Sequence, residues 1–388
     1  MLGLLLARAG IETLVLEKHG DFLRDFRGDT VHPSTLDVMH ELGLLQEFLQ
    51  LPHQQVHELR GRIGDTEFTL ADFSRTPTQC HFIALMPQWH FLNFLAERGA
   101  RLPKFQLLMN ARVTGLAQDG GGIRGVEAQT EQGPLHVTAE LVIGADGRHS
   151  TVRAAAGLPV EDLGSPIDVL WFRLPRHASD PGQTGGYFNT GRIVVTLNRG
   201  DFWQCAFVIR KGQLDTLRAR GLEAFRAEVG RIVPLFGDRV GELCSWDEIK
   251  LLTVTVDRLR KWWRPGLLCI GDAAHAMSPV GGVGINLAIQ DAVAAANILA
   301  PALLEGRLEA AHLEAVQRRR SFPTWVTQAM QVFLQNRVIN RVLGVDRALT
   351  VPWPLQLLNR WPRLRRIPAR LIGVGVRPEH VRTPVVAT

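Results

Sequence analysis

The feature that most constrains this chain is the stretch from Leu267 to Asn286. A run of apolar residues, typical of a buried strand, ends in Gly271-Asp272. A glycine-rich turn follows, and the next residues have the apolar spacing of a long helix. A carboxylate at a strand end can accept hydrogen bonds from the hydroxyls of a polyol chain. Because backbone N–H groups at a helix start favour negative charge, the pattern predicts a site for a ligand that carries both features.

A flavin meets both requirements. Its ribityl chain carries hydroxyls, and its reduced ring carries negative charge near N1 and O2, where a positive dipole stabilises it. The alternative is a glycine-rich phosphate loop of another kind. It is not a Walker A loop, since no Lys-Ser or Lys-Thr pair follows the glycines.

The first residues have the pattern of the second half of a nucleotide-binding βαβ unit. Residues 2–9 favour a helix, Gly10 favours its end, and residues 11–17 favour a short strand that ends in Glu17. The acid at that position binds a ribose hydroxyl, roughly 20 residues after the first glycine of a GxGxxG loop. Counting back by that distance passes Met1. We therefore expect this chain to lack the first strand and the glycine loop, through a misplaced start or a fragmentary sequence. An N-terminal helix packed on an ordinary parallel sheet is the alternative.

A third motif, from Gly144 to Arg153, follows another run that is typical of a buried strand. Gly147 permits a close approach of the backbone, and Asp146 can orient sugar hydroxyls or a charged neighbour. A simple turn between strand and helix, capped by Ser150, is the alternative. From about residue 166 to 260 the pattern is rich in strands, and after about residue 310 it is helical and rich in arginine.

The composition excludes several classes of protein. Hydrophobic residues make up 46% and charged residues 21%, which allows a large core and argues against disorder. Cys80, Cys205, Cys244 and Cys269 form no CxxC pair, which argues against a zinc site and favours a reducing, cytoplasmic setting. The net charge is +6, but no repeat of basic and aromatic residues indicates nucleic-acid binding.

Residues 14–17, the Asp-Gly pair at 146–147 and the glycine-rich stretch at 271–286 together resemble the single-component FAD monooxygenases. Para-hydroxybenzoate hydroxylase and the ubiquinone-biosynthesis hydroxylases belong to that family. The resemblance covers nearly the whole chain. It implies an α/β fold in which a Rossmann-like FAD-binding domain, without its first strand and glycine loop, carries an inserted, mostly antiparallel β-sheet substrate domain and a helical C-terminal segment. The expected boundaries are 1–75, 76–165 and 261–310 for the FAD-binding parts, 166–260 for the substrate domain and 311–388 for the C-terminal segment.

The resemblance assigns cofactor-binding roles to particular residues. Glu17 is expected to bind the adenosine ribose, Arg27 the pyrophosphate and ribityl region, and Gln88 the ribityl chain. Val113 is expected to contact adenine through its backbone. The alternatives are a solvated charge for Arg27, a polar helix start for Gln88 and a plain core residue for Val113. The full expected set is Glu17, Arg27, Gln88, Val113, Asp146, Gly271, Asp272, Pro279, Gly282, Gly284, Ile285 and Asn286.

The resemblance also implies a two-part reaction. NADH or NADPH, bound transiently, reduces FAD, and reduced flavin reacts with O₂ to form a flavin hydroperoxide that hydroxylates an aromatic or other electron-rich, apolar small molecule. The protein shields this reaction from water and positions the substrate. No residue is assigned as the catalytic base. His32 and His275 are candidates because imidazole titrates near neutrality, and a structural role beside the flavin loop is the alternative for both.

Two groups of side chains bear on the partner molecules. Aromatic residues in the strand-rich region could line an apolar pocket or form ordinary core: Trp171, Phe172, Phe188, Phe202, Trp203 and Phe207. Arginines stand among apolar residues near the C-terminus: Arg337, Arg341, Arg347, Arg360, Arg363, Arg365, Arg366 and Arg370. They fit either a peripheral contact with an anionic membrane or the outer face of a packed helical cap, which we favour.

Two other functions stay open. A flavin reductase or flavin halogenase shares the scaffold, although the lysine-and-tryptophan signature of the halogenases is not evident in this sequence. A chain that cannot hold FAD because it lacks the glycine loop would be a non-catalytic remnant.

Overall fold

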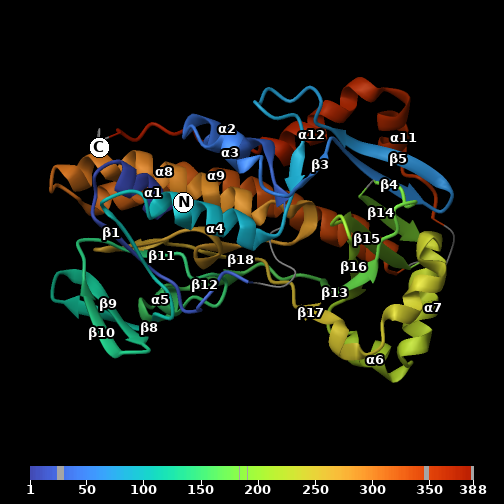
Figure 1. Cartoon of the computed structure of the whole chain (residues 1–388), viewed down its shortest axis with the longest axis horizontal. Coiled ribbons are helices and arrows are strands. Elements are labelled where there is room, and N and C mark those ends of the chain that lie inside the picture. Colours follow the sequence, from blue (N-terminus) through green and yellow to red (C-terminus); the bar gives the residue numbers. More distant parts are fainter. Residues whose placement is uncertain (24–29, 183, 190, 345–348, 386–388) are drawn as a thin grey trace.

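The computed structural model describes residues 1–23, 30–182, 184–189, 191–344 and 349–385. Figure 1 shows two lobes. In one lobe, the helices α8 (Gly284–Leu304) and α9 (Ala310–Phe333) lie side by side above several small sheets. The other lobe is a large sheet covered on one side by α6 (Leu214–Ala219) and α7 (Leu222–Ile232).

The first lobe contains two separate parallel pairs of strands. α1 (Leu2–Arg8) ends just before Gly10, whose φ of +88° turns the chain back toward β1 (Thr13–Leu16). β1 pairs in parallel with β7 (Phe105–Leu108), and β11 (Val142–Gly144) pairs in parallel with β20 (Leu267–Cys269). Within the described residues, no backbone ladder joins the two pairs.

The core of this lobe is built around α8. It contacts α1, α9 and α2 (Pro33–Glu41), and Val293, Ala296 and Leu299 are fully buried. By length and composition alone, Val280–Leu304 could cross a membrane. However, 61% of its most apolar window is buried inside the protein, so packing in the core accounts for its apolar character.

A seven-stranded sheet forms the second lobe, in the order β17-β13-β16-β15-β14-β4-β5. Neighbours run antiparallel except β14 and β4, which are parallel. The hairpin of β4 and β5 comes from residues 58–72, outside the range 166–260 that we expected for the substrate domain. The strands are β4 (Glu58–Ile63), β5 (Thr66–Asp72), β13 (Ile167–Pro175), β14 (Gly185–Asn189), β15 (Arg192–Asn198), β16 (Phe202–Arg210) and β17 (Lys250–Leu252).

The other described strands and helices form smaller sheets and short helices around these two lobes. An antiparallel sheet is formed by β8 (Arg112–Asp119), β9 (Gly122–Thr130) and β10 (Gly133–Thr138). Shorter strands are β2 (Thr30–Val31), β3 (Gln54–Val56), β6 (Ile83–Leu85), β12 (Val160–Asp162), β18 (Asp257–Leu259), β19 (Trp263–Arg264) and β21 (His275–Ala276). Further helices are α3 (Leu45–Phe48), α4 (Gln88–Gly99), α5 (Thr151–Ala155), α10 (Asn340–Val342), α11 (Trp353–Arg360) and α12 (Arg366–Gly373).

The C-terminal helices α11 and α12 cover β5, the edge strand of the large sheet. The side chain of Asn359 takes the place of a neighbouring strand. Its Nδ2 donates to the carbonyl of Glu67 at 3.0 Å, and its Oδ1 accepts from the backbone N–H of Thr69 at 3.2 Å. On α12, Ala369 packs in the same apolar cluster as Phe73, and Gly373 lies against the ring of Phe73. The sheet edge is thereby closed by this segment.

The turn between β19 and β20 gives a test of the fold. Gly266 has a φ of +75°, and a Cβ atom there would lie 2.0 Å from the carbonyl oxygen of Ile123. We expect Gly266→Ala to lower the free energy of unfolding by about 2–5 kcal/mol, because backbone strain and a collision add. Gly212→Ala is the control, since Gly212 has a similar φ of +77° but open space around it. Urea denaturation measures both, and equal losses would contradict the packing described for Gly266.

Candidate functional site

A cavity of about 2300 Å³ lies where the two lobes meet. Residues 13–17 of the first lobe line it together with residues 145–149 and 270–272. Residues 277–285, which form the turn before α8 and its first residues, line another part. The apolar face of the seven-stranded sheet lines a third part, with Val169 among its residues. The sequence motifs and the strand-rich region therefore border one common space.

The turn before α8 needs glycine. Gly281 and Gly282 have φ values of +83° and +63°, and a Cβ atom on Gly282 would lie 2.4 Å from Thr30 Oγ1. The hydroxyl of Thr30 donates to the carbonyl of Gly282 at 2.8 Å. Among the described residues no side chain caps α8, and Gly284 and Ile285 line the cavity. The backbone N–H groups of the first helical turn thus stay available to a ligand.

Asn286 holds this turn from behind. Its Nδ2 donates to the carbonyls of Thr30 and Gly282 at 3.0 and 3.2 Å. Its Oδ1 accepts from the backbone N–H of His32 and from the hydroxyl of Thr35, both at 2.8 Å. The side chain is buried and uses its amide for these bonds, so Asn286 positions the turn rather than facing the cavity.

Arg153 joins the Asp-Gly motif to the Gly-Asp motif. Its Nη2 donates to the carbonyl of Arg148 at 2.5 Å, and its Nη1 donates to the carbonyl of Ala273 and to Asp257, both at 3.3 Å. Arg148 in turn places its Nη2 3.6 Å from the carboxylate of Asp272, which is one-third exposed at the cavity wall. The two turns are therefore held in one arrangement although 120 residues separate Arg153 from Ala273.

Asp146 is engaged within its own motif. One carboxylate oxygen accepts from the hydroxyl of Ser150 at 2.5 Å, and the other accepts from the backbone N–H of Val152 at 3.1 Å. Ser150 itself accepts from the N–H of Arg153 at 2.8 Å. This geometry is that of a capped turn at the start of α5, the alternative raised for the motif. Asp146 nevertheless lies at the cavity wall.

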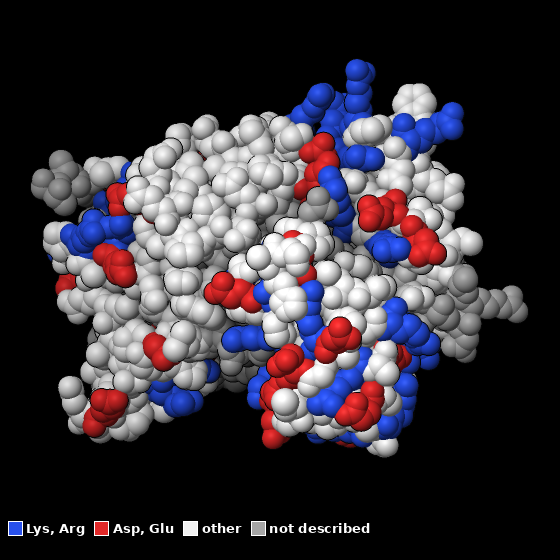
Figure 2. Space-filling model, turned by 45° about the vertical axis from the view of Figure 1, so that its right-hand side comes forward, with Lys and Arg blue, Asp and Glu red and all other residues white. Residues whose placement is uncertain are grey.

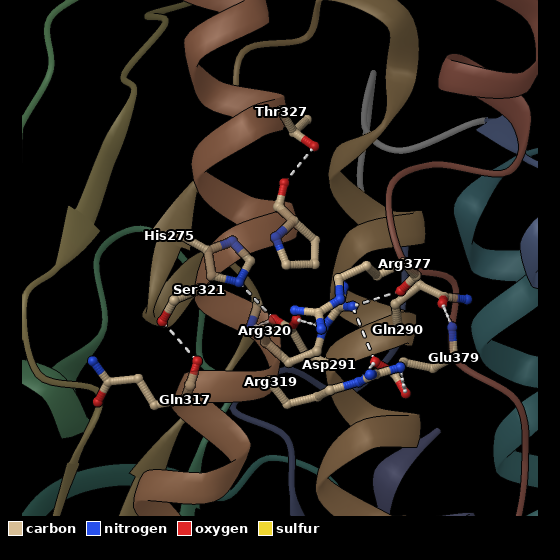
Figure 3. A network of polar contacts seen from close by, with 12 residues as sticks. His275, Gln290, Asp291, Gln317, Arg319, Arg320, Ser321, Thr327, Arg377 and Glu379 are labelled. Atoms are coloured by element: carbon tan, nitrogen blue, oxygen red, sulfur yellow. Dashed lines mark hydrogen bonds and ion pairs between the residues drawn. The ribbon is translucent and has the colours of Figure 1, made fainter.

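Figure 3 shows a buried charge network around Asp291, and this network also holds the turn at Gly271. The carboxylate of Asp291 accepts from the backbone N–H of Gly271 at 3.0 Å, contacts His275 Nε2 at 2.5 Å and accepts from Arg320 Nε at 2.8 Å. Asp291, His275 and Arg320 are each at most 1% exposed. Burial acts to raise the pKa of Asp291, but the charges and hydrogen bonds of His275 and Arg320 outweigh it and lower the pKa.

The same network fixes the end of the chain. Glu379 contacts Arg320 at 3.4 Å and accepts from Arg319 Nε at 2.6 Å, while its backbone N–H donates to Gln290 (Figure 3). α8, α9 and the C-terminal tail thus share one set of buried charges. Our sequence reasoning missed Asp291 and Arg320. The available signal was an acidic residue inside an otherwise apolar helix, which requires a buried partner.

The expected cofactor-binding residues come together, with two exceptions. Asn286 lies behind the turn, and Arg27 lies outside the described residues. The expected residues that line the cavity are Glu17, Gln88, Val113, Asp146, Gly271, Asp272, Pro279, Gly282, Gly284 and Ile285. Direct contact of each of these residues with a cofactor stays a prediction.

The aromatic residues of the large sheet divide between its two faces. Because side chains alternate along a strand, Phe172, Trp203 and Phe207 point toward α7 and form core, which excludes them from the pocket we had considered. Trp171 and Phe188 lie on the opposite face and line the cavity. Phe202 is not a lining residue; the guanidinium of Arg173 lies 4.9 Å from its ring centroid.

Neither candidate histidine lines the cavity. Burial lowers the pKa of His32 to about 4, partly offset by a hydrogen bond at 2.8 Å between its Nδ1 and the carbonyl of Ile372. His32 is therefore uncharged at neutral pH, and it ties α2 to the end of α12. His275 is committed to Asp291. Both geometries support the structural alternative.

The residues present fit FAD. The Gly282 turn packs on Thr30 without room for a side chain, and the N–H groups at the start of α8 border the cavity beside it. Asp272 offers a carboxylate to hydroxyls, and Glu17 lies at the end of β1 on the same cavity. At about 2300 Å³ the cavity exceeds the roughly 300–1,000 Å³ of ordinary ligand pockets, so it has room for a dinucleotide and a substrate.

The buried network predicts a stability effect with a defined pH range. We expect Asp291→Asn to lower the free energy of unfolding at pH 7 by about 3–5 kcal/mol, because it leaves Arg320 buried without its nearest carboxylate. Since the folded pKa of Asp291 is lowered, this contribution is complete above the unfolded value near 4 and is lost as the pH falls through the folded value. Denaturation at pH 7 and pH 3 tests this, with the exposed Asp215→Asn as control. The prediction is contradicted if the difference in free energy of unfolding between Asp291→Asn and the unchanged chain already disappears between pH 7 and pH 5.

His32 predicts a second loss of stability on acidification, at a higher pH than that of Asp291. Its folded pKa of about 4 lies below its unfolded value of 6.5, so its contribution is complete above pH 6.5 and declines as the pH falls toward 4. At about 1.4 kcal/mol per pKa unit, the loss reaches roughly 3 kcal/mol. We expect His32→Gln to remove this part of the pH dependence. Unfolding of both proteins across pH 4–8 measures it, and parallel curves would refute the assignment.

Comparison with known proteins identifies relatives along the whole chain. A family model described as FAD binding domain matches residues 1–330. The 6-methylpretetramide 4-monooxygenase of Streptomyces rimosus is 33% identical over 98% of this chain and 91% of its own length. The ubiquinone hydroxylase UbiL of Rhodospirillum rubrum is 32% identical over 54% of this chain and 47% of its own length.

A solved structure shares the fold. The crystal structure of pqsL of Pseudomonas aeruginosa, described as a probable FAD-dependent monooxygenase, superimposes with a TM-score of 0.73. The match covers 95% of each chain at 21% identity, which is evidence for the fold alone. The expected α/β fold, a Rossmann-like part with an added sheet, is thereby confirmed.

The family match spans every motif on which the resemblance was based. Residues 14–17, the Asp-Gly pair at 146–147 and the stretch 271–286 all lie inside the matched range. Identity to the Streptomyces enzyme extends through the C-terminal helices as well. This chain belongs to the FAD-binding-domain family of flavin-dependent aromatic monooxygenases.

Proposed function

We propose that this chain uses NADH or NADPH, FAD and O₂ to hydroxylate an aromatic or other electron-rich, apolar small molecule. The observation that carries the proposal is one shared cavity. The uncapped start of α8 and Asp272 border it on one side, and the apolar face of the seven-stranded sheet borders it on another. A flavin held by the first side would face a substrate held by the second.

The cofactor supplies the redox chemistry when it is bound, and the chain supplies position and environment. Asp272 would accept hydrogen bonds from the ribityl hydroxyls, and the N–H groups of Gly284 and Ile285 would favour negative charge on the ring edge. Trp171, Val169 and their neighbours provide an apolar wall that excludes water. No described titratable side chain on this wall is assigned as an acid or base.

The substrate class follows from the size and character of the wall. Arg60 of β4 lines the cavity, but most lining side chains of the sheet are aliphatic or aromatic, among them Ile167, Val169, Trp171, Phe188, Ile193, Val195, Leu197, Ala206 and Val208. Such a wall favours a flat, apolar molecule over a charged one. The relative that is named for 6-methylpretetramide makes that compound the first substrate to test.

A reducing, cytoplasmic setting belongs to the same proposal. All four cysteines are free thiols, and Cys80, Cys205 and Cys269 are buried. Burial raises the pKa of Cys269 to about 12, so this thiol beneath the Gly-Asp turn is inert.

The direct experiment has two stages. Titration of the purified chain with FAD, followed by flavin fluorescence, tests cofactor binding on its own. The loaded protein is then mixed with NADH or NADPH under ¹⁸O₂ and a panel of phenols, quinols and 6-methylpretetramide. We expect substrate-stimulated nicotinamide oxidation and one labelled oxygen atom in the product. A chain that takes up no FAD would overturn the proposal and favour the non-catalytic alternative, whereas halogenation without oxygen transfer would favour the halogenase alternative.

Gly282 gives a sharper test of the flavin site. We expect Gly282→Ala to weaken FAD binding at least tenfold, because the new Cβ collides with Thr30 Oγ1 and displaces the turn. Gly281→Ala is the matched control, since Gly281 has a comparable φ of +83° but meets no atom closer than 3.6 Å. Fluorescence titration compares the two affinities. Equal affinities would show that the turn does not approach the cofactor.

A further inference from the structure

The outer face of the C-terminal helices carries exposed apolar residues in regular rows. Trp353, Leu357 and Trp361 follow one another at intervals of four residues along α11 and past its end, and the two tryptophans are 74% and 59% exposed. Ile367 and Leu371 form a similar pair on α12. Residues four apart lie on one side of a helix, so each row forms a continuous apolar strip.

Arginines flank these strips. Arg360 and Arg363 lie near the end of α11, and Arg366 and Arg370 form an exposed row on α12 beside Ile367 and Leu371. The sequence contains no Asp or Glu from residue 347 to residue 378. In the part of the chain that the structure describes, no ion pair involves these four arginines. Figure 2 shows Lys and Arg side chains standing out from the end of the molecule that carries α11 and α12.

The inner side of the segment is firmly attached, so its outer side is not a loose surface. Asn359 is bonded to both Glu67 and Thr69 of β5, and Arg365 Nε donates to the carbonyl of Leu358 at 3.0 Å. Ala369 is fully buried, and Ile372 packs against the same cluster. In this segment, small and polar residues therefore pack on the sheet, whereas tryptophan, leucine, isoleucine and arginine are exposed.

We propose that this face, Trp353 to Leu371, docks on an anionic lipid bilayer. Exposed tryptophan and aliphatic residues enter the interface between headgroups and acyl chains, while the neighbouring arginines contact lipid phosphates. Charge favours this occupant over a second copy of the chain. A two-fold interface through the face would bring the same arginine cluster of each copy against the other without any acidic residue of the segment between them.

The docking face meets the cavity. Leu371, which is 41% exposed, lines the cavity together with Pro368 and Ile372, so α12 carries both exposed apolar residues and part of the cavity wall. A lipophilic substrate dissolved in the bilayer therefore enters beside α12 without crossing bulk water. This delivery role rests on the proposed function, whereas binding to the bilayer does not depend on FAD or on turnover.

Vesicle flotation tests the docking. The full chain is mixed with vesicles of phosphatidylcholine alone or with 30% phosphatidylglycerol, at 50 mM and 500 mM salt. We expect binding to the anionic vesicles at low salt, little binding to neutral vesicles, and release at high salt because surface charges are then screened. Arg366→Gln with Arg370→Gln should weaken the partition coefficient by roughly tenfold or more. Trp353→Ala with Trp361→Ala should weaken it comparably.

The matched control is Arg218→Gln with Arg231→Gln, which removes the same charge from exposed positions on α6 and α7. It should bind like the unchanged chain. All variants alter exposed side chains, and unchanged thermal unfolding confirms that they fold. The inference is overturned if anionic vesicles are not bound at low salt, or if the control weakens binding as much as the α12 pair. It is also overturned if the double variant Arg366→Gln with Arg370→Gln leaves vesicle binding unchanged and abolishes dimer formation or oligonucleotide binding.

Discussion

The carboxylate of Asp291 is the interaction on which the arrangement of this protein depends. Three groups meet at it: the backbone N–H of Gly271, the imidazole of His275 in the same short segment, and the guanidinium of Arg320 from α9. A fully buried carboxylate is costly unless it is paired and hydrogen-bonded. Here both carboxylate oxygens of Asp291 have partners. A different packing of α8 on α9 would leave these charges unpaired. The network therefore selects one arrangement of the helices, and that arrangement sets the position of the turn that carries Asp272.

The turns on the cofactor side of the cavity are held by side-chain hydrogen bonds from Thr30, which lines the cavity, and from Asn286 and Arg153, which do not. Thr30 and Asn286 fix the glycine turn, and Arg153 bonds the Asp-Gly turn to the Gly-Asp turn. Two of these bonds join distant parts of the chain, Thr30 to Gly282 and Arg153 to Ala273, and the other two are local. Together they form a frame that holds the two turns at the cavity wall. Such a frame suits a cofactor that must be held at a fixed angle to its substrate.

Local motifs predicted much of the site, and long-range packing decided the rest. The strand that leads to the turn with Asp272, the glycine turn and the helix start were readable because spacing and backbone requirements are local. The face of the sheet on which Phe172 lies was not, since period-two alternation says which residues share a face but not which face is covered by α7. The hairpin at 58–72 joins the large sheet because β4 pairs with β14. These strands are more than 100 residues apart in the sequence, so no local pattern predicts the pairing. The engagement of Asp146 with Ser150 was open from sequence and is resolved by geometry.

The amide of Asn359 has a consequence beyond local packing. By bonding to Glu67 and Thr69 it occupies the hydrogen-bonding positions through which another strand would extend the sheet. A chain whose final segment detached would offer a bare strand edge to its neighbours, and growth from molecule to molecule could begin there. The C-terminal segment therefore closes a sheet edge at which such growth would otherwise begin, apart from any part that it has in chemistry.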